Sequence, residues 1–317
     1  MKKILILLLM VNSLVMAKSI KMPIATFQAD GAVTDIIYKD AKLYASTSAG
    51  VVDIFDMKSK KIINKIKIPK IKNFMGDDIN AKIYSVDISN NTILLLAQGL
   101  RGFREVYLYN NSNLKKIINV SDKLTIAKAK FIDNDNILLA LLSNDIISYN
   151  IKTKKENWKV QASMSKFSNF AMNEDKTKVI IADESGDLHL IDVKSSKLLK
   201  TLSGQNLDNV FALDYKNNTI ITAGQDRRAV VYDLTSNSAY YKTSHFLIYS
   251  SGLSPSAKLA AFASDEKNNV TVFKTSTKTN IAVFGGNKMT LTKILFINEN
   301  NFFVASDDKV INFYKIK

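Results

Sequence analysis

The stretch Glu184–Gly204, ESGDLHLIDVKSSKLLKTLSG, contains two short strand patterns and the turns that bound them. Ser185–Asp187 is a turn sequence, because the glycine at its centre accepts a positive φ without steric cost. Leu188–Val193 and Leu198–Leu202 are rich in strand-forming residues, and the polar run 194–197 predicts a hairpin loop between them. Similar segments recur along the chain, so the strand and turn positions of this stretch can be compared with those of the other segments.

Two markers recur in step over seven copies of this unit. The first marker is the residue just before the acidic or polar residue that ends the third strand of each copy. Successive first markers are 54, 40, 42, 41, 41 and 41 residues apart. The second is an alanine that ends the preceding strand. A repeat of roughly 40–45 residues with four strands is that of a propeller blade. The first markers are Phe55, Tyr109, Tyr149, Ile191, Tyr232, Phe273 and Tyr314; the second are Ala45, Ala97, Ala140, Ala182, Ala223, Ala263 and Ala305.

The ends of the chain complement each other. The last copy, Leu291–Lys317, has only three strand patterns, whereas Ser19–Gln28 is a spare strand before the first complete copy. Pairing the spare strand with the last copy would close the ring and remove an exposed sheet edge. The sequence therefore predicts an all-β fold: a single seven-bladed WD40-like β-propeller domain over residues 18–317.

The repeats resemble the WD40 family over essentially all of residues 18–317. The Trp-Asp pair of that family is replaced by FD, YN, ID, YD or FK, and its Gly-His pair is absent. The aspartate between the second and third strands has counterparts, and the resemblance implies a structural role for it in a turn hydrogen-bond network. These counterparts are Asp145, Asp187, Asp226 and Asp307 or Asp308.

The first 17 residues have the pattern of a Sec signal peptide. Lys2-Lys3 precedes the apolar run Ile4–Val11, and Val15-Met16-Ala17 fits the small-residue rule for cleavage after Ala17. The alternative is an uncleaved membrane anchor, but the apolar run is far shorter than the ~20 residues that a spanning helix needs. We therefore expect an exported, monomeric periplasmic protein that is not inserted in the membrane.

The formal charge of +15 does not indicate a nucleic-acid-binding protein. Only four of the 44 basic residues are arginine, and the lysines are scattered along strand positions that we predict to face solvent. The absence of Cys excludes disulfides and thiolate metal ligands. His189 and His245 lack a second histidine at metal-ligand spacing. We expect no catalytic residues, no cofactor and no metal.

Two insertions break the repeat between the first and second markers: Pro69–Asn80, which connects two blades, and Gln98–Glu105, an extended turn. Because neighbouring strands alternate in direction, both are expected on one face of the ring. Arginine and aromatic residues are enriched at interaction hot spots. The candidate partner-binding residues are Lys72, Phe74, Met75, Arg101, Phe103 and Arg104, with Arg227 and Arg228 on the same face across the ring. The alternative is that Arg104 pairs with a nearby acid and the loops are tolerated insertions.

The whole pattern, with its signal peptide and its Lys- and Asn-rich degenerate blades, also resembles the NapL family. These are accessory proteins encoded with periplasmic nitrate reductase in Epsilonproteobacteria. The resemblance implies a non-catalytic role in maturation or assembly of that enzyme, with one of its subunits as partner. Two alternatives stay open. One is a generic envelope-assembly scaffold, and the other is a propeller hydrolase or lactonase, which needs a metal or an acid–base cluster in the central channel.

Overall fold

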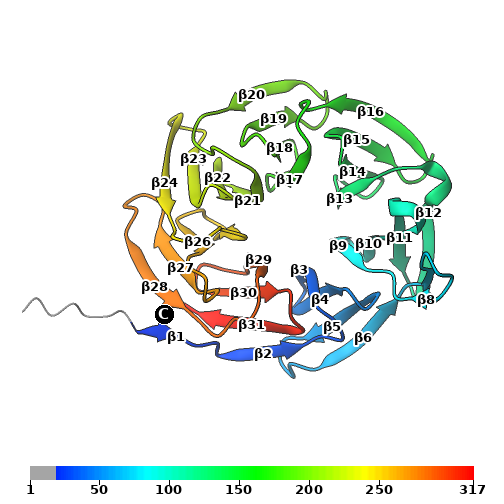
Figure 1. Ribbon diagram of the computed structural model, residues 1–317, viewed down its shortest axis with the longest axis horizontal. Coiled ribbons are helices and arrows are strands. Elements are labelled where there is room, and N and C mark those ends of the chain that lie inside the picture. Colours follow the sequence, from blue (N-terminus) through cyan, green and yellow to red (C-terminus); the bar gives the residue numbers. More distant parts are fainter. Residues whose placement is uncertain (1–18) are drawn as a thin grey trace, which may run out of the picture.

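A computed structural model describes residues 19–317, so the predicted signal peptide lies outside the described residues. Seven antiparallel sheets surround a central channel, and a separate two-stranded hairpin projects between two of them (Figure 1). Within the described range, two single-turn 3₁₀ segments are the only helical elements, and no helix is long and apolar enough to cross a bilayer. The predicted seven-bladed β-propeller is confirmed.

Each blade runs from an inner strand at the channel to an outer strand at the rim. From the inside outward, blade 1 contains β3 (Val33–Lys39), β4 (Lys42–Thr47), β5 (Val51–Asp56) and β6 (Ile62–Lys67); blade 2 contains β9 (Ile83–Ser89), β10 (Thr92–Gln98), β11 (Arg104–Asn110) and β12 (Asn113–Ile118); blade 3 contains β13 (Ile126–Phe131), β14 (Asn136–Leu141), β15 (Asp145–Asn150) and β16 (Lys155–Gln161); blade 4 contains β17 (Phe167–Met172), β18 (Lys178–Asp183), β19 (Leu188–Asp192) and β20 (Leu198–Leu202).

The remaining blades follow the same plan. Blade 5 contains β21 (Val210–Lys216), β22 (Thr219–Gly224), β23 (Arg228–Asp233) and β24 (Ser238–Thr243); blade 6 contains β25 (Ser251–Leu253), β26 (Leu259–Ala263), β27 (Val270–Lys274) and β28 (Asn280–Phe284); blade 7 contains β29 (Leu291–Phe296), β30 (Asn301–Ser306), β31 (Val310–Lys315) and β2 (Ala25–Gln28).

The core lies between the faces of adjacent blades. Second strands are apolar on both sides, as in β14, where Ile137–Leu141 are all buried. Outer strands have one face toward solvent, so β16 alternates between exposed and half-buried residues. Each blade therefore covers the next, and stability comes from face-to-face sheet packing around the whole ring.

The ring is closed as predicted, with one difference. β2 pairs antiparallel with β31, and the ring of Phe27 lies 5.5 Å from that of Phe55 and 5.7 Å from that of Phe303. The predicted strand Ser19–Gln28 is divided, however, because β1 (Ile20–Lys21) leaves blade 7 and pairs in parallel with β28 of blade 6. Pro23 lies between the two pieces, where its missing N–H suits a break in pairing.

The propeller has two distinct faces. We call the upper face the one that carries the connections from each outer strand to the next inner strand and the turns between second and third strands. Both insertions lie on this face. The first forms the hairpin of β7 (Ile71–Lys72) and β8 (Asp78–Ile79), and the second contains η1 (Leu100–Gly102). The prediction that they share a face is therefore correct.

Candidate functional site

The β7–β8 hairpin presents two apolar side chains on a rigid turn. Asn73 Oδ1 accepts hydrogen bonds from the backbone N–H of Met75 at 2.8 Å and of Asp77 at 2.9 Å, and Asn73 Nδ2 donates to Asp77 Oδ2 at 3.0 Å. Phe74 is 104% exposed and Met75 86% exposed. Since the turn is fixed by its own hydrogen bonds, these side chains are held in solvent without an intramolecular contact that explains their apolar character.

The second insertion is organised by Arg104. Its guanidinium lies 4.2 Å from the centroid of the Tyr84 ring, and its Nη1 donates to the carbonyl of Gly102 at 2.7 Å. Arg104 therefore has a structural role, since it holds its own loop against the inner strand of blade 2, and its binding role stays a prediction. Arg101 remains exposed, with φ at 56°, and Phe103 is half-buried.

Of the two arginines of blade 5, one is stacked and hydrogen-bonded like Arg104 and the other is exposed like Arg101. Arg228 stacks 4.2 Å from the Tyr241 ring centroid and donates to the Gln205 carbonyl at 2.8 Å. Arg227 is exposed at φ 64°. The structure thus places six of the eight predicted residues in the two insertions of blades 1 and 2 or at the start of β11, and it places Arg227 and Arg228 on the same face, where β22 turns into β23 of blade 5.

Exposed apolar residues on other upper-face loops were missed by the sequence prediction. All of them lie in connections between blades or in turns between second and third strands. Among residues 19–317, no turn of the opposite, lower face exposes a large hydrophobic side chain. Each is a large apolar residue within a predicted turn, where polar residues are usual, and this pattern could have identified them in the sequence. They are Leu100, Leu142, Met164, Leu207, Phe246 and Met289.

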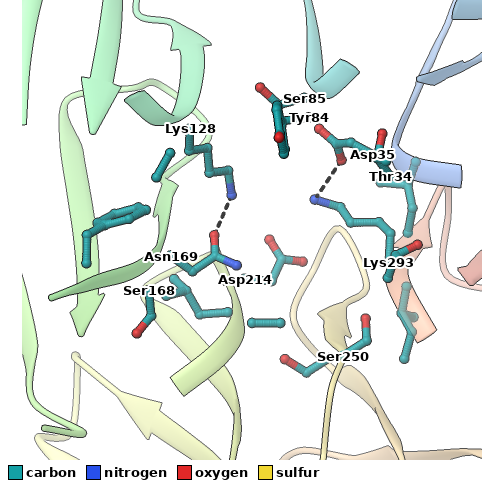
Figure 2. A pocket seen from close by; sticks show the side chains of 18 of the residues that line it. Thr34, Asp35, Tyr84, Ser85, Lys128, Ser168, Asn169, Asp214, Ser250 and Lys293 are labelled. Atoms are coloured by element: carbon teal, nitrogen blue, oxygen red, sulfur yellow. Dashed lines mark hydrogen bonds and ion pairs between the residues drawn. The ribbon is translucent and has the colours of Figure 1, made fainter. Parts of the chain in front are cut away.

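The central channel contains charged side chains, so the prediction that the strand lysines face outer solvent is wrong for Lys128, Lys130, Lys216 and Lys293. Figure 2 shows Lys128 and Lys293 pointing into the channel from opposite sides, with Asp35 and Asp214 near them. In six of the seven inner strands a β-bulge occurs at the same place, and Lys128 and Lys293 each follow it directly. Strand alternation alone cannot distinguish a channel-facing position from a solvent-facing one.

Asp35 is the most connected of these groups. Its carboxylate lies 2.9 Å from Lys130 Nζ and 3.6 Å from Lys293 Nζ, and it accepts the backbone N–H of Val86 at 3.3 Å. Burial opposes ionisation of this carboxyl, but the neighbouring ammonium groups outweigh it and hold the pKa of Asp35 well below its usual value.

Lys128 is in a different environment. Its Nζ donates to Asn169 Oδ1 at 2.6 Å and to the carbonyl of Phe170 at 2.7 Å, both neutral acceptors. Burial, together with repulsion from Lys293 and Lys130, lowers the pKa of Lys128 well below its usual value. Asp35 and Asp214 oppose this shift, but among the described residues neither forms a direct ion pair with Lys128.

His189 belongs to a buried network between blades 3 and 4. Asp183 Oδ2 accepts from Ser163 Oγ at 2.5 Å and lies 3.2 Å from His189 Nε2. Burial of Asp183 opposes its ionisation, yet the hydrogen bonds from His189, Ser163 and Ser185 lower its pKa to about 2. Because Asp183 lies between Ser163 and His189, the imidazole is not placed to take the serine proton, as a catalytic triad requires.

The aspartates that the WD40 resemblance assigns to turns differ in their contacts. Asp226 follows the expected role, since it accepts the backbone N–H of Arg228 at 2.9 Å and that of Leu207 at 2.8 Å. Asp145 accepts from Ser143 Oγ at 2.7 Å. The acidic turn at Asp183 is likewise held by hydrogen bonds, and in the described part of the chain no three acidic or histidine side chains gather as a metal site.

The comparisons with known proteins do not assign this chain to a family. No family model matches it, and no curated protein matches it. The functional proposal therefore rests on the geometry of the upper face and on the sequence pattern.

Proposed function

We propose that this protein is a non-catalytic interaction scaffold that docks a protein partner on its upper face. The observation that carries this proposal is the difference between the two faces: exposed large apolar side chains occur on seven loops of the upper face and on no turn of the lower face within residues 19–317. A single exposed apolar residue is ordinary on a protein surface, but the confinement of these turn residues to one face, with Phe74 and Met75 side by side on one hairpin, favours an interaction site there.

The β7–β8 hairpin is the proposed anchor. Phe74 and Met75 lose no intramolecular contact when a partner covers them, so their full apolar area contributes to binding, at roughly 25 cal/mol per Å². The hydrogen bonds of Asn73 reduce the entropy that the loop must lose on docking. Lys72 is an exposed cation on this hairpin, paired with Asp78 at 2.9 Å, and Arg101 is an exposed cation on the blade 2 turn of the same face.

We further propose export to the periplasm through the predicted signal peptide and, as partner, a subunit of periplasmic nitrate reductase. The support for this partner is the resemblance of the sequence pattern to the NapL family. The protein would act in maturation or assembly of the reductase, as a monomer and through surface contacts.

The test is an affinity capture from the periplasm of nitrate-grown cells. The double substitution Phe74→Ser with Met75→Ser should reduce partner recovery by at least roughly tenfold, as expected for hot-spot residues. The control, Ile63→Ser with Leu198→Ser, removes two large apolar side chains that are about half exposed on outer strands and should leave recovery unchanged.

Two outcomes would contradict different parts of the proposal. Full recovery of the partner by a folded hairpin variant would refute the upper-face anchor. Capture of outer-membrane assembly factors in place of reductase subunits would refute the nitrate reductase assignment, leave the docking face intact and favour the generic envelope scaffold.

A further inference from the structure

The upper end of the central channel holds a small cavity of about 290 Å³ (Figure 2). Residues from all seven inner strands or the loops that lead into them line it. About half of its surface is polar, with lysine, aspartate, asparagine and hydroxyl groups beside apolar side chains from the inner strands. A cavity of this volume fits a small molecule, and polar groups that converge in it would fix the orientation of that molecule.

The first observation that points to a ligand is the isolation of Lys128. Lys130 and Lys293 lie beside Asp35, and Lys216 lies 3.6 Å from Asp214. Within residues 19–317, Lys128 makes no ion pair and has only the Asn169 amide oxygen and a backbone carbonyl as acceptors. Lys128 is half-buried, with its Nζ also 5.0 Å from the centroid of the Phe170 ring, and a partly desolvated cation without an ion-pair partner is costly, so an anion beside it would be stabilised.

The second observation is independent of charge. Ser251, from the inner strand of blade 6, lines the same cavity and is 5% exposed. Its Oγ finds no hydrogen-bond partner anywhere in the described part of the chain. A buried hydroxyl normally satisfies its hydrogen-bonding capacity. An oxygen-rich ligand in the cavity would supply the missing partner.

We propose that this cavity binds a small monocarboxylate that also carries hydroxyl groups, such as a sugar acid or a hydroxy acid. The carboxylate would pair with Lys128, and a hydroxyl of the ligand would hydrogen-bond to Ser251. The lining has three lysines and two aspartates, and Asp35 also pairs with Lys130, so the site has a net positive charge that attracts a carboxylate, while Asp35 and Asp214 oppose a second negative charge such as that of a phosphate dianion. This inference concerns the channel alone and does not depend on the docking of a protein partner.

Binding should be linked to proton uptake. Burial and the ammonium groups of Lys293 and Lys130 lower the pKa of Lys128 by more than Asp35 and Asp214 raise it, and an adjacent ligand carboxylate would raise it further. The cation that binds the ligand is present below the lowered pKa and disappears as the pH rises through it. Affinity should therefore fall with rising pH, and calorimetry in buffers of different ionisation enthalpy should detect protons taken up.

The experiment is isothermal titration of the purified protein with D-gluconate, D-galacturonate and L-lactate up to roughly 10 mM, where even a millimolar site is mostly filled. D-Glucitol, which has hydroxyl groups and no charge, tests whether binding needs a negative charge. Inorganic phosphate tests whether the site prefers one negative charge to two. At least one monocarboxylate should bind, and D-glucitol and phosphate should bind at least roughly tenfold more weakly.

Two variants test the assigned contacts. Lys128→Met removes the ammonium and keeps the stem, and Ser251→Ala removes only the unpartnered hydroxyl; each should weaken binding roughly 10- to 100-fold. Lys176→Met is the matched control, because Lys176 lies at the lower end of the channel and not in this cavity. If Lys128→Met does not fold, the binding affinity of Ser251→Ala and the pH dependence of binding to the wild-type protein test the proposal instead. Absence of binding by all three carboxylates, equal binding of D-glucitol, or unchanged binding in a folded variant would overturn the proposal.

Discussion

Asp35 and Lys130, which are 95 residues apart in sequence, form an ion pair of 2.9 Å inside the central channel. They belong to the inner strands of blades 1 and 3, and the same carboxylate accepts a hydrogen bond from Val86 of the intervening blade 2. Lys293 of blade 7 lies 3.6 Å away on the other side. One carboxylate thus connects four consecutive blades of the ring at its axis.

Substituting Asp35→Asn should destabilise the protein substantially. The change leaves Lys130 buried without its anionic partner, and breaking a buried pair in this way costs about 3–5 kcal/mol. Urea unfolding followed by the fluorescence of the single Trp158 would measure the loss. Asp30→Asn is the matched control, because the Asp30–Lys65 pair is about one-third exposed and its removal should cost less than about 1 kcal/mol.

The stability that Asp35 contributes should depend on pH. Its pKa is lower in the folded protein than in the unfolded chain, where an aspartate titrates near about 4. The contribution is therefore fully present above about pH 4 and is lost as the pH falls from there toward the lowered pKa. We expect the difference in urea midpoint between wild type and Asp35→Asn to be largest near neutral pH and to shrink in acid. A difference that stays constant with pH would show that Asp35 acts through packing alone.

Phe27 should be essential for closing the ring. It is 1% exposed and packs edge-on between Phe55 of blade 1 and Phe303 of blade 7. Phe27→Ala should destabilise the protein by about 3–5 kcal/mol and increase proteolysis of the N-terminal segment, since a cavity would remain between these two blades. Ile24→Ala, at a position 55% exposed, should have an effect within about 0.5 kcal/mol.

Substitutions of Arg104 and Arg101 in the blade 2 loop should separate effects on stability from effects on partner binding. Arg104→Ala removes the stacking on Tyr84 and the hydrogen bond to Gly102, so we expect a loss of about 1–2 kcal/mol in stability. Arg101→Gly places a residue tolerant of positive φ at 56° and should change stability by less than about 1 kcal/mol. If Arg101 contributes to docking, this folded variant should still capture less partner than wild type does.

Much of the fold follows from the sequence because its period is repeated seven times. The stretch from Glu184 to Gly204 predicts strands at 188–193 and 198–202, and the structure has β19 at Leu188–Asp192 and β20 at Leu198–Leu202. Alternating strand direction also placed both insertions on one face correctly. The division of the N-terminal strand was not predicted, because its cause is the pairing of β1 with β28, a contact between distant parts of the chain.

The charged residues that line the channel could not be predicted from the sequence for a related reason. A lysine such as Lys128 alternates with apolar neighbours on its strand as a surface lysine does, and only the closed ring converts that surface into an interior. Asp35 and Lys130 are likewise ordinary strand residues in the sequence and become partners because their strands meet at the axis. The local pattern determines which side a residue faces, whereas the closed assembly determines what lies on that side.

The pairing of β2 with β31 has a kinetic consequence. The first strand of the propeller finds its antiparallel partner only among the last residues of the chain, so this contact is formed across nearly the maximum possible sequence separation. A ribosome finishes β2 long before β31 exists, and the nascent edge has no native partner in the interval. Folding rates fall as contacts become less local. Formation of the final blade should therefore be the slowest step of folding, and a chain truncated near its C-terminus should lack a complete ring.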